Sequence, residues 1–173
     1  MSEAHHCRLF VRLPAGSGFD EALSQALSDS ETASVLLPAG SPADEHARAA
    51  VQKIQAADRP ALVVDDLALR ATLQADGVHL TDSAAVRAVR AKLGDGLTLG
   101  VECPLERHAC MVAAEDGADY VAVRVTAETL DEAEELLDWW HEVMTTPVVA
   151  LVDGPVEIER LRAYADFVSP IPD

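Results

Sequence analysis

The sequence predicts an α/β fold, a compact (β/α)8 or TIM barrel formed by a single domain over residues 1–173. Short apolar runs alternate with segments of helical periodicity to the end of the chain. The runs are continuously apolar, as expected for parallel strands covered by helices. Ala-Asp junctions between a helix and a strand begin at positions 75, 118 and 165, which corresponds to one βα unit per roughly 22 residues. Eight units of this regularity favour a closed barrel over a doubly wound, flavodoxin-like sheet, which is the alternative.

Eight strands are expected because eight apolar runs are bounded by turn-forming or charged residues. Pro14 ends the first run, Pro38 ends the second, and Asp65-Asp66 follows the third. The expected strands lie at 7–13, 33–37, 60–64, 77–80, 97–101, 120–123, 147–151 and 167–169.

Seven helices are expected between these strands. The clearest start is Ser41 followed by Pro42, a serine N-cap with proline at the first helical position. The expected helices lie at 19–27, 42–57, 67–73, 83–93, 105–115, 130–144 and 156–164. The eighth strand has only four residues after it, so the barrel is expected to be incomplete, with its last helix missing. An apolar groove beside strands eight and one should then be covered by a partner, and a homodimer is expected.

Charge and composition exclude several classes of protein. The 13 basic and 30 acidic residues give a net charge of −17, which repels phosphate backbones and anionic lipids, so neither nucleic acid nor a membrane is an expected partner. No apolar run approaches the roughly 20 residues that span a bilayer. The N-terminus lacks the features of a secretory signal. Three cysteines are an odd number, and reduced thiols in a cytoplasmic protein are the expected state.

Acidic side chains gather at the carboxyl ends of the predicted strands, where a barrel of this kind forms its site. They are Asp65, Asp66, Asp82, Glu102 and Asp153. Crowded carboxylates recruit cations, and Mg²⁺ is usually held by one or two of them, so Asp65 with Asp82 is the expected metal pair. Asp66, Glu102 and Asp153 are expected to line the pocket for a small-molecule ligand. The alternative is that these residues form solvated turns or cap helices.

Two further side chains are candidates for catalysis. His79 lies between Val78 and Leu80, so alternation points it into the barrel interior if its neighbours face the helices. There it is either a general acid or base, or a core histidine with satisfied hydrogen bonds. Arg124 is the only cation that this reasoning places at the mouth. It either grips an anionic group of a ligand or neutralises Glu102 or Asp153.

Common phosphate-binding and nucleophile motifs do not occur in the sequence. Neither G-x-x-x-x-G-K-[ST], G-x-G-x-x-G nor G-x-S-x-G is found. The two lysines, Lys53 and Lys92, both fall on outer helices. A Schiff-base lysine and a lysine clamp on pyrophosphate are therefore not expected.

The segments 75–80, 117–121 and 146–150 resemble the thiamine phosphate synthase family and its thiazole tautomerase relatives over roughly residues 60–152. The resemblance implies a (β/α)8 barrel that couples a pyrimidine pyrophosphate to a thiazole phosphate, with Mg²⁺ on the pyrophosphate. It implies that Asp65 matches a metal-binding aspartate, with Asp82 as a substitute for the second. The histidine at position 79 is kept.

Other positions depart from the family pattern. Val64 replaces an asparagine, Glu102 replaces a serine near the pyrimidine, and Arg124 stands where glycine is usual. Val152-Asp153 replaces the pair of glycines that cradles the thiazole phosphate, and the tautomerase histidine falls at Val125.

The mouth is therefore expected to be negative and its activity altered, because carboxylates have replaced cations and bare amides. Three functions are compatible with it. The protein acts in thiamine metabolism with weak or altered transferase activity, or it is a non-catalytic binding or regulatory subunit. As a third alternative, the acidic mouth serves an enzyme that acts on a cationic or metal-bound small molecule.

Overall fold

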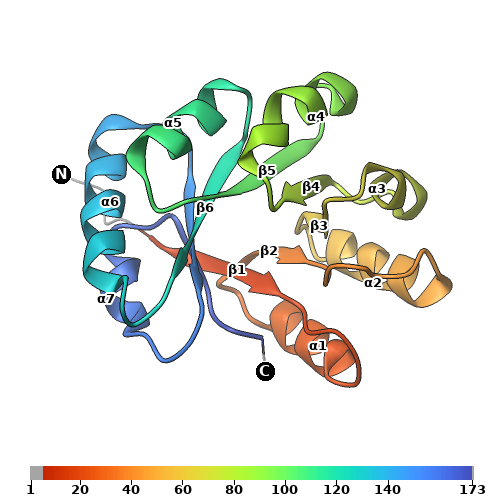
Figure 1. Ribbon diagram of the computed structural model, residues 1–173. Coiled ribbons are helices and arrows are strands. Elements are labelled where there is room, and N and C mark those ends of the chain that lie inside the picture. Colours follow the sequence, from red (N-terminus) through yellow and green to blue (C-terminus); the bar gives the residue numbers. More distant parts are fainter. Residues whose placement is uncertain (1–5, 173) are drawn as a thin grey trace.

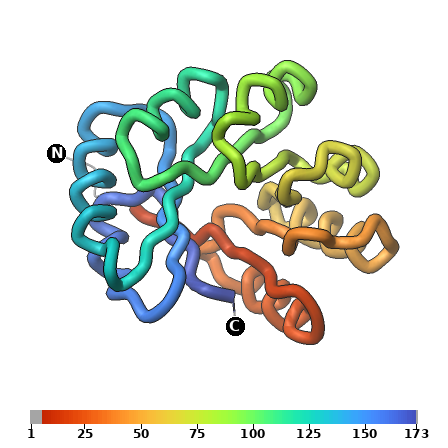
Figure 2. Tube along the Cα trace, viewed as in Figure 1, coloured from red at the N-terminus to blue at the C-terminus, as the bar shows by residue number. Residues whose placement is uncertain are grey.

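The computed structural model describes residues 6–172 and contains a closed barrel of eight parallel strands. The strands follow one another around the ring in chain order, and β8 pairs with β1 to close it. Helices cover the outside of the ring (Figures 1 and 2). The predicted (β/α)8 fold is confirmed, and the open doubly wound sheet is not formed.

The strands are short and largely buried. They are β1 (Arg8–Arg12), β2 (Thr32–Leu36), β3 (Ala61–Val64), β4 (Gly77–Leu80), β5 (Thr98–Cys103), β6 (Tyr120–Val125), β7 (Val148–Val152) and β8 (Phe167–Ser169). β5 and β6 extend further than the expected strands, so Glu102 and Arg124 lie within strands rather than after them.

Seven α-helices lie between the strands of the described chain. They are α1 (Phe19–Ser28), α2 (Glu45–Ala56), α3 (Leu67–Leu73), α4 (Val86–Leu93), α5 (Arg107–Glu115), α6 (Leu130–Val143) and α7 (Ile158–Arg162). A 3-10 turn at Ser83–Ala85 precedes α4, so the expected helix over 83–93 has two parts.

The start of α2 differs from the expectation. Asp44, not Ser41, is the N-cap, and its carboxylate accepts a hydrogen bond from the Ala47 amide. The Ser41 hydroxyl instead donates to the Pro38 carbonyl at 2.7 Å. Both side chains are good caps, and the turn after Pro38 engages the serine before the helix begins.

Alternation along each strand separates two apolar cores. Residues such as Val78, Leu99 and Val121 face outward and pack beneath the helices. The inward positions fill the lumen with a second cluster, made of Phe10, Leu36, Leu62, Tyr120, Ala122, Val149 and Leu151. Apolar side chains therefore fill most of the lumen, and the charged side chains converge at the carboxyl ends of the strands.

A glycine in β5 makes room for the largest ring in the lumen. A Cβ atom added to Gly100 would lie 1.8 Å from the ring of Tyr120. The missing side chain lets the tyrosine cross toward β4, where its hydroxyl meets His79. Gly100 thus positions Tyr120 through close approach of a ring to the backbone.

The seam at which β8 pairs with β1 and closes the barrel is short. β8 has three residues, and its pairing with β1 joins Arg8 to Phe167 and Leu9 to Val168. No helix follows β8 in the described chain, and residues 170–172 instead line a groove of about 450 Å³ beside β1 and α1. Among the described residues, no helix is both long and apolar enough to cross a membrane.

Candidate functional site at the mouth of the barrel

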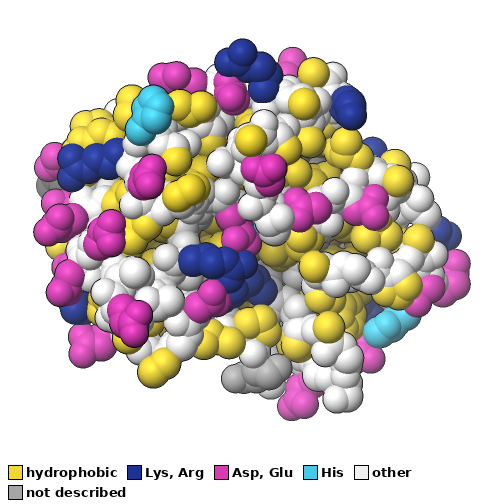
Figure 3. Space-filling model, viewed as in Figure 1, with side chains coloured by type: hydrophobic (Ala, Val, Ile, Leu, Met, Phe, Trp, Pro, Cys, Tyr) yellow, Lys and Arg dark blue, Asp and Glu magenta, His cyan; other side chains and the backbone are white. Residues whose placement is uncertain are grey.

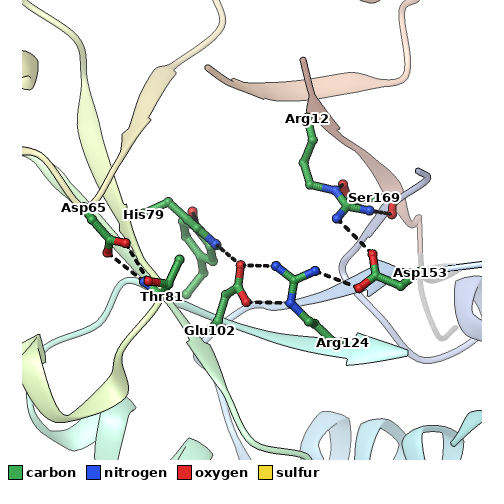
Figure 4. Close-up of polar contacts among 9 residues, drawn as sticks. Arg12, Asp65, His79, Thr81, Glu102, Arg124, Asp153 and Ser169 are labelled. Atoms are coloured by element: carbon green, nitrogen blue, oxygen red, sulfur yellow. Dashed lines mark hydrogen bonds and ion pairs between the residues drawn. The ribbon is translucent and has the colours of Figure 1, made fainter. Parts of the chain in front are cut away.

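The uppermost inward positions of five strand ends carry polar side chains that meet in one network. Arg12, His79, Glu102 and Arg124 lie on β1, β4, β5 and β6, and Asp153 directly follows β7. Figure 4 shows these side chains pointing toward one another across the ring. Each lies two residues beyond an inward apolar residue or a glycine of its own strand, and because side chains alternate along a strand, all five point to the same side and converge.

Arg124 lies at the centre of the network. Its Nε and Nη2 donate to the two oxygens of Glu102 at 2.8 and 2.9 Å, and its Nη1 donates to Asp153 at 2.7 Å. The sequence left open whether Arg124 neutralises Glu102, neutralises Asp153 or grips a ligand. The structure pairs it with both carboxylates, and its side chain remains 48% exposed.

His79 is buried below this pair, with 1% of its side chain exposed. Its Nε2 lies 3.3 Å from Glu102 and its Nδ1 lies 2.7 Å from the Tyr120 hydroxyl. An ionised Glu102 can only accept, so Nε2 carries the hydrogen, and in the neutral ring Nδ1 accepts from Tyr120. Both ring nitrogens are thus satisfied within the protein, as in a core histidine.

The charges of the network stabilise one another. Burial tends to raise the pKa of Glu102, but hydrogen bonds from His79 and Arg124 outweigh it and hold the pKa below its usual value. The pKa of Asp153 is likewise lowered, because its bonds to Arg124 and Arg12 outweigh its desolvation. The pKa of Tyr120 is raised well above its usual value by burial and then by the charge of Glu102. At neutral pH the network therefore holds two ionised carboxylates and a protonated tyrosine.

Arg12 corrects the expectation that Arg124 is the only cation at the mouth. Its Nη1 lies 3.4 Å from Asp153, and its Nε donates to the Ser169 hydroxyl at 2.9 Å. Two arginines therefore balance Glu102 and Asp153, and the centre of the mouth is neutral rather than negative. Near the middle of the face in Figure 3, basic side chains lie between acidic ones. Arg12 was overlooked, although it lies two residues after the inward Phe10 and the alternation used for His79 identifies it.

The predicted metal pair lies to one side of this network. Asp65 accepts hydrogen bonds from the amide and hydroxyl of Thr81, at 2.8 and 2.5 Å. Its φ of 53° is in the left-handed region, which is unusual for a residue with a side chain. Asp82 caps the 3-10 turn by accepting from the Ala84 amide, and Asp66 caps α3 by accepting from the Leu69 amide.

These carboxylates do not form a preformed cation site. Both oxygens of Asp65 already accept hydrogen bonds, and Asp82 is engaged in its cap. In the part of the chain that the structure describes, no group of three or more His, Cys, Asp or Glu side chains is placed to hold a metal ion. The described carboxylates therefore do not form a dedicated cage for Mg²⁺, which is usually held by one or two carboxylates together with ligand phosphates.

A pocket of about 460 Å³ opens over the ends of β4, β5 and β6. Its lining includes Asp82, Glu102 and Arg124, together with the apolar Pro104 and Leu105. Asp82, the partly exposed Glu102 and the exposed edge of the Arg124 guanidinium are the charged groups that a ligand in this pocket meets. Asp66 and Asp153, which were expected to line the ligand pocket, are absent from its lining, and Asp153 lies on the other side of Arg124.

The three cysteines are free thiols with buried side chains. Burial raises the pKa of Cys7 to about 11. The pKa of Cys103 is also raised, first by its hydrogen bond with Cys110 and then by burial. His108 is exposed whereas Cys110 is fully buried, so these two side chains point in different directions. Cys7 and Cys103 are therefore protonated thiols at neutral pH, whereas the hydrogen bond from Cys103 lowers the pKa of the buried Cys110.

Comparison with known proteins places most of the chain in one family. A family model described as thiamine monophosphate synthase matches residues 21–165. The chain is 35% identical to a thiamine-phosphate synthase of Rhodospirillum centenum, with 94% of this chain and 86% of the relative covered. It is 38% identical to a thiamine-phosphate synthase of Erythrobacter litoralis, with 93% of this chain and 84% of the relative covered.

Solved structures share the fold. A thiamine phosphate pyrophosphorylase from Pyrococcus furiosus superimposes with a TM-score of 0.75 at 20% identity, covering 96% of this chain and 86% of its own. A tryptophan synthase from M. tuberculosis superimposes with a TM-score of 0.66 at 17% identity, covering 96% of this chain and 83% of its own. At these identities the likeness establishes the barrel alone.

Proposed function

The chain belongs to the thiamine monophosphate synthase family, and on that premise we propose that its barrel mouth binds the phosphorylated pyrimidine and thiazole of thiamine biosynthesis and couples them weakly. The observation that carries this proposal is the pocket over β4–β6, whose charged lining includes Glu102 and Arg124. In the family reaction, the bond from the pyrimidine methylene carbon to pyrophosphate breaks. The thiazole nitrogen then bonds to that carbon.

Weak coupling follows from the charges at the mouth. A pyrophosphate carries about three negative charges, and it meets arginines that are already paired with Glu102 and Asp153. Binding must either separate these pairs or add uncompensated negative charge beside two carboxylates. Each such contact costs on the order of a few kcal/mol in a partly desolvated cleft. The two lysines of the chain lie on the outer helices α2 and α4, so neither offsets this charge at the mouth.

Within this function, Arg124 is the side chain that contacts an anionic group of the ligand, and Glu102 sets the orientation of Arg124. His79 acts as a positioning residue, because its ring is buried and its Nε2 contacts Glu102 rather than the pocket. Mg²⁺ remains a prediction from the family resemblance. A bound metal would neutralise pyrophosphate charge, and Asp65 is the residue that the resemblance assigns to it.

Calorimetry with the pyrimidine pyrophosphate and the thiazole phosphate, each with and without MgCl₂, tests the proposal together with an assay for thiamine phosphate. We expect both organic ligands to bind and product to form slowly. Glu102→Gln should alter the binding of both ligands, whereas Glu128→Gln, an exposed carboxylate after β6, should leave it unchanged. Asp65→Asn should abolish any effect of MgCl₂ on binding. If neither ligand binds to folded protein, the proposal is wrong.

A second candidate is a barrel that binds a small molecule without catalysis. The observation that favours it is that His79, Glu102, Arg124 and Asp153 are all hydrogen-bonded to one another or to Tyr120, so no polar group of the network is left as a free acid or base. Binding of both ligands without product formation identifies this function. The expected homodimer remains a prediction in either case, and light scattering on a sizing column tests it.

The third candidate, an enzyme that acts on a cationic or metal-bound small molecule, requires a more negative mouth than the structure shows. The sequence argument for it was a negative mouth, and Arg12 and Arg124 balance the charges of Glu102 and Asp153. Binding of an amine or of Mg²⁺ alone, without either phosphorylated ligand, would identify it in the same calorimetric experiment.

A further inference from the structure

Two of the three cysteines lie beside each other between β5 and α5. Cys103 is the last residue of β5, and Cys110 lies in α5, which packs against β5 and β6. The thiol of Cys110 donates to the carbonyl oxygen of Pro104, the residue after Cys103, with 3.8 Å between sulfur and oxygen. The thiol of Cys103 donates in turn to the sulfur of Cys110. The two sulfur atoms are therefore hydrogen-bonded to each other in the reduced protein.

The pair is buried on one side and reaches the ligand pocket on the other. Cys110 is fully buried in the core beneath the helices, whereas Cys103 is 7% exposed and lines the pocket over β4–β6. A small oxidant in this pocket therefore meets Cys103 before Cys110. Cys7 precedes β1, so in a ring of parallel strands it lies at the opposite end of the barrel from Cys103.

The hydrogen bond between the thiols favours the loss of one proton from the pair. It raises the pKa of Cys103, the donor, and lowers the pKa of Cys110, the acceptor. The thiolate is the form of cysteine that reacts with oxidants. Once one proton has left, the other lies between the two sulfurs, and its transfer to Cys110 places the thiolate on Cys103, at the pocket.

We propose that Cys103 and Cys110 form a reversible disulfide when hydrogen peroxide enters the pocket, and that this modification changes the pocket wall. The Cys103 thiolate attacks one peroxide oxygen and the O–O bond breaks. The departing hydroxide takes up a proton from water, which leaves a sulfenic acid on Cys103. The sulfur of Cys110 then bonds to that of Cys103, the S–O bond breaks, and the hydroxyl leaves as water with the Cys110 proton. The two thiols together lose two electrons, and one peroxide is reduced to two waters.

The surroundings of the pair explain how the disulfide acts on the pocket. Sulfurs that already share a hydrogen bond have to approach to the S–S length of about 2.05 Å, a change that rotation of the two side chains provides. The new bond ties the end of β5 to α5 and removes the thiol that donates to Pro104. Pro104 and Leu105 line the pocket next to Cys103, so the wall changes with them. This effect on ligands rests on the proposed function, whereas the disulfide itself does not.

Peptide mapping tests the disulfide directly, because trypsin separates the three cysteines. Cleavage after Arg8 and Arg107 leaves Cys7, Cys103 and Cys110 in different peptides. The reduced full chain is treated with hydrogen peroxide, its remaining thiols are blocked with iodoacetamide in denaturant, and the digest is analysed by mass spectrometry without reductant. We expect the Cys103 peptide to be linked to the Cys110 peptide and Cys7 to carry the blocking group. Dithiothreitol should restore all three thiols.

Two variants and an unfolded control make the result specific. Cys7→Ser should form the same disulfide, since Cys7 lies at the other end of the barrel. Cys110→Ala should leave Cys103 without a partner, so peroxide should carry it to the sulfenic and sulfinic acids. The wild-type chain in guanidinium chloride should give mixed pairings of the three cysteines. Circular dichroism confirms that each variant is folded, and Cys103→Ser replaces Cys110→Ala if the latter does not fold.

Calorimetry on the reduced and oxidised wild type tests the effect on the pocket. For whichever phosphorylated ligand binds the reduced protein, oxidation should lower the affinity at least about threefold, because the wall no longer has its reduced shape. Dithiothreitol should restore the affinity.

Three results overturn the proposal. The first is that Cys103 and Cys110 of the folded chain are both blocked after a peroxide treatment that oxidises the unfolded chain. The second is a disulfide that includes Cys7 or joins two chains. The third, a Cys103–Cys110 disulfide that leaves ligand affinity unchanged, overturns its effect on the pocket. If neither ligand binds the reduced protein, the proposed function fails, while peptide mapping still decides whether the disulfide forms.

Discussion

Glu102 joins the buried and the exposed parts of the polar network, because it accepts from His79 on one side and from Arg124 on the other. Its side chain is 16% exposed, so both interactions are largely shielded from water. The folded state favours its ionised form, and stability must therefore depend on pH.

We expect Glu102→Gln to lower the free energy of unfolding at pH 7 by about 1–3 kcal/mol, because hydrogen bonds to a charged group are lost. The pKa of Glu102 is depressed from its usual 4.5, so its contribution is complete above that pH and is lost as pH falls through the lower folded-state value. Urea unfolding between about pH 7 and pH 3 should show a shallower acid loss in the variant than in the wild type. If the free energy of unfolding falls equally with pH in both proteins, Glu102 does not have a depressed pKa in the folded state.

Tyr120 contributes through its hydroxyl as well as its ring. Tyr120→Phe keeps the ring in the lumen but leaves the buried Nδ1 of His79 without its partner. We expect a loss of about 1–3 kcal/mol, measured as a shift in the urea midpoint at constant slope. Tyr164→Phe, at a half-buried tyrosine beside α7, is the matched control and should change stability by less than about 0.5 kcal/mol. If the free energy of unfolding falls equally in Tyr120→Phe and Tyr164→Phe, the His79–Tyr120 hydrogen bond does not contribute to stability.

At the scale of the strand, Gly100 determines how far Tyr120 can reach across the lumen. A methyl group at position 100 collides with a ring that is packed on several sides, so Gly100→Ala should cost about 1–3 kcal/mol. Gly96→Ala is the matched control, since a Cβ there meets nothing within 4 Å. Thermal unfolding of both variants distinguishes the two positions. A stable Gly100→Ala variant with unchanged tyrosine fluorescence would contradict this packing.

Sequence periodicity predicted every strand and α-helix, because each element has one apolar face that must be buried. The boundaries were less predictable. Ser41 and Asp44 are equally good caps by residue type, and only the turn after Pro38 decides between them. The shortening of α7 to Ile158–Arg162, against the expected 156–164, likewise depends on packing that no local pattern contains.

The candidate site was predictable as a location but not as a set of partners. Glu102, Arg124 and Asp153 were expected at one end of the barrel because the carboxyl ends of parallel strands meet there. Their pairing depends on side-chain conformations and on Arg12, which the sequence reasoning did not place at the mouth. Tyr120 was also missed, because its contact with His79 requires the absence of a side chain at Gly100 on the strand between them.

For the molecule as a whole, the charge of −17 destabilises the folded state through repulsion that surface ion pairs only partly offset. Salt screens this repulsion, so the melting temperature at pH 7 should rise by a few degrees, on the order of 1 kcal/mol, as sodium chloride increases from about 0.05 to 0.5 M. Near the isoelectric point of about 4.5 the net charge vanishes and the rise should disappear. A salt effect of equal size at both pH values would show that screening of net charge is not its cause.

The short pairing of β1 with β8 affects how the chain folds during its synthesis. β1 acquires its second neighbour only through residues 167–169, and Arg12 forms its bonds to Ser169 and Pro170 at the same stage. While the ribosome is still producing the intervening helices, one border of β1 has no hydrogen-bonding partner and can associate with another nascent chain. Closure also joins segments at opposite ends of the described sequence, a non-local event that slows folding. The yield of native protein should therefore depend on how quickly this final strand emerges, more than on the strength of any helix.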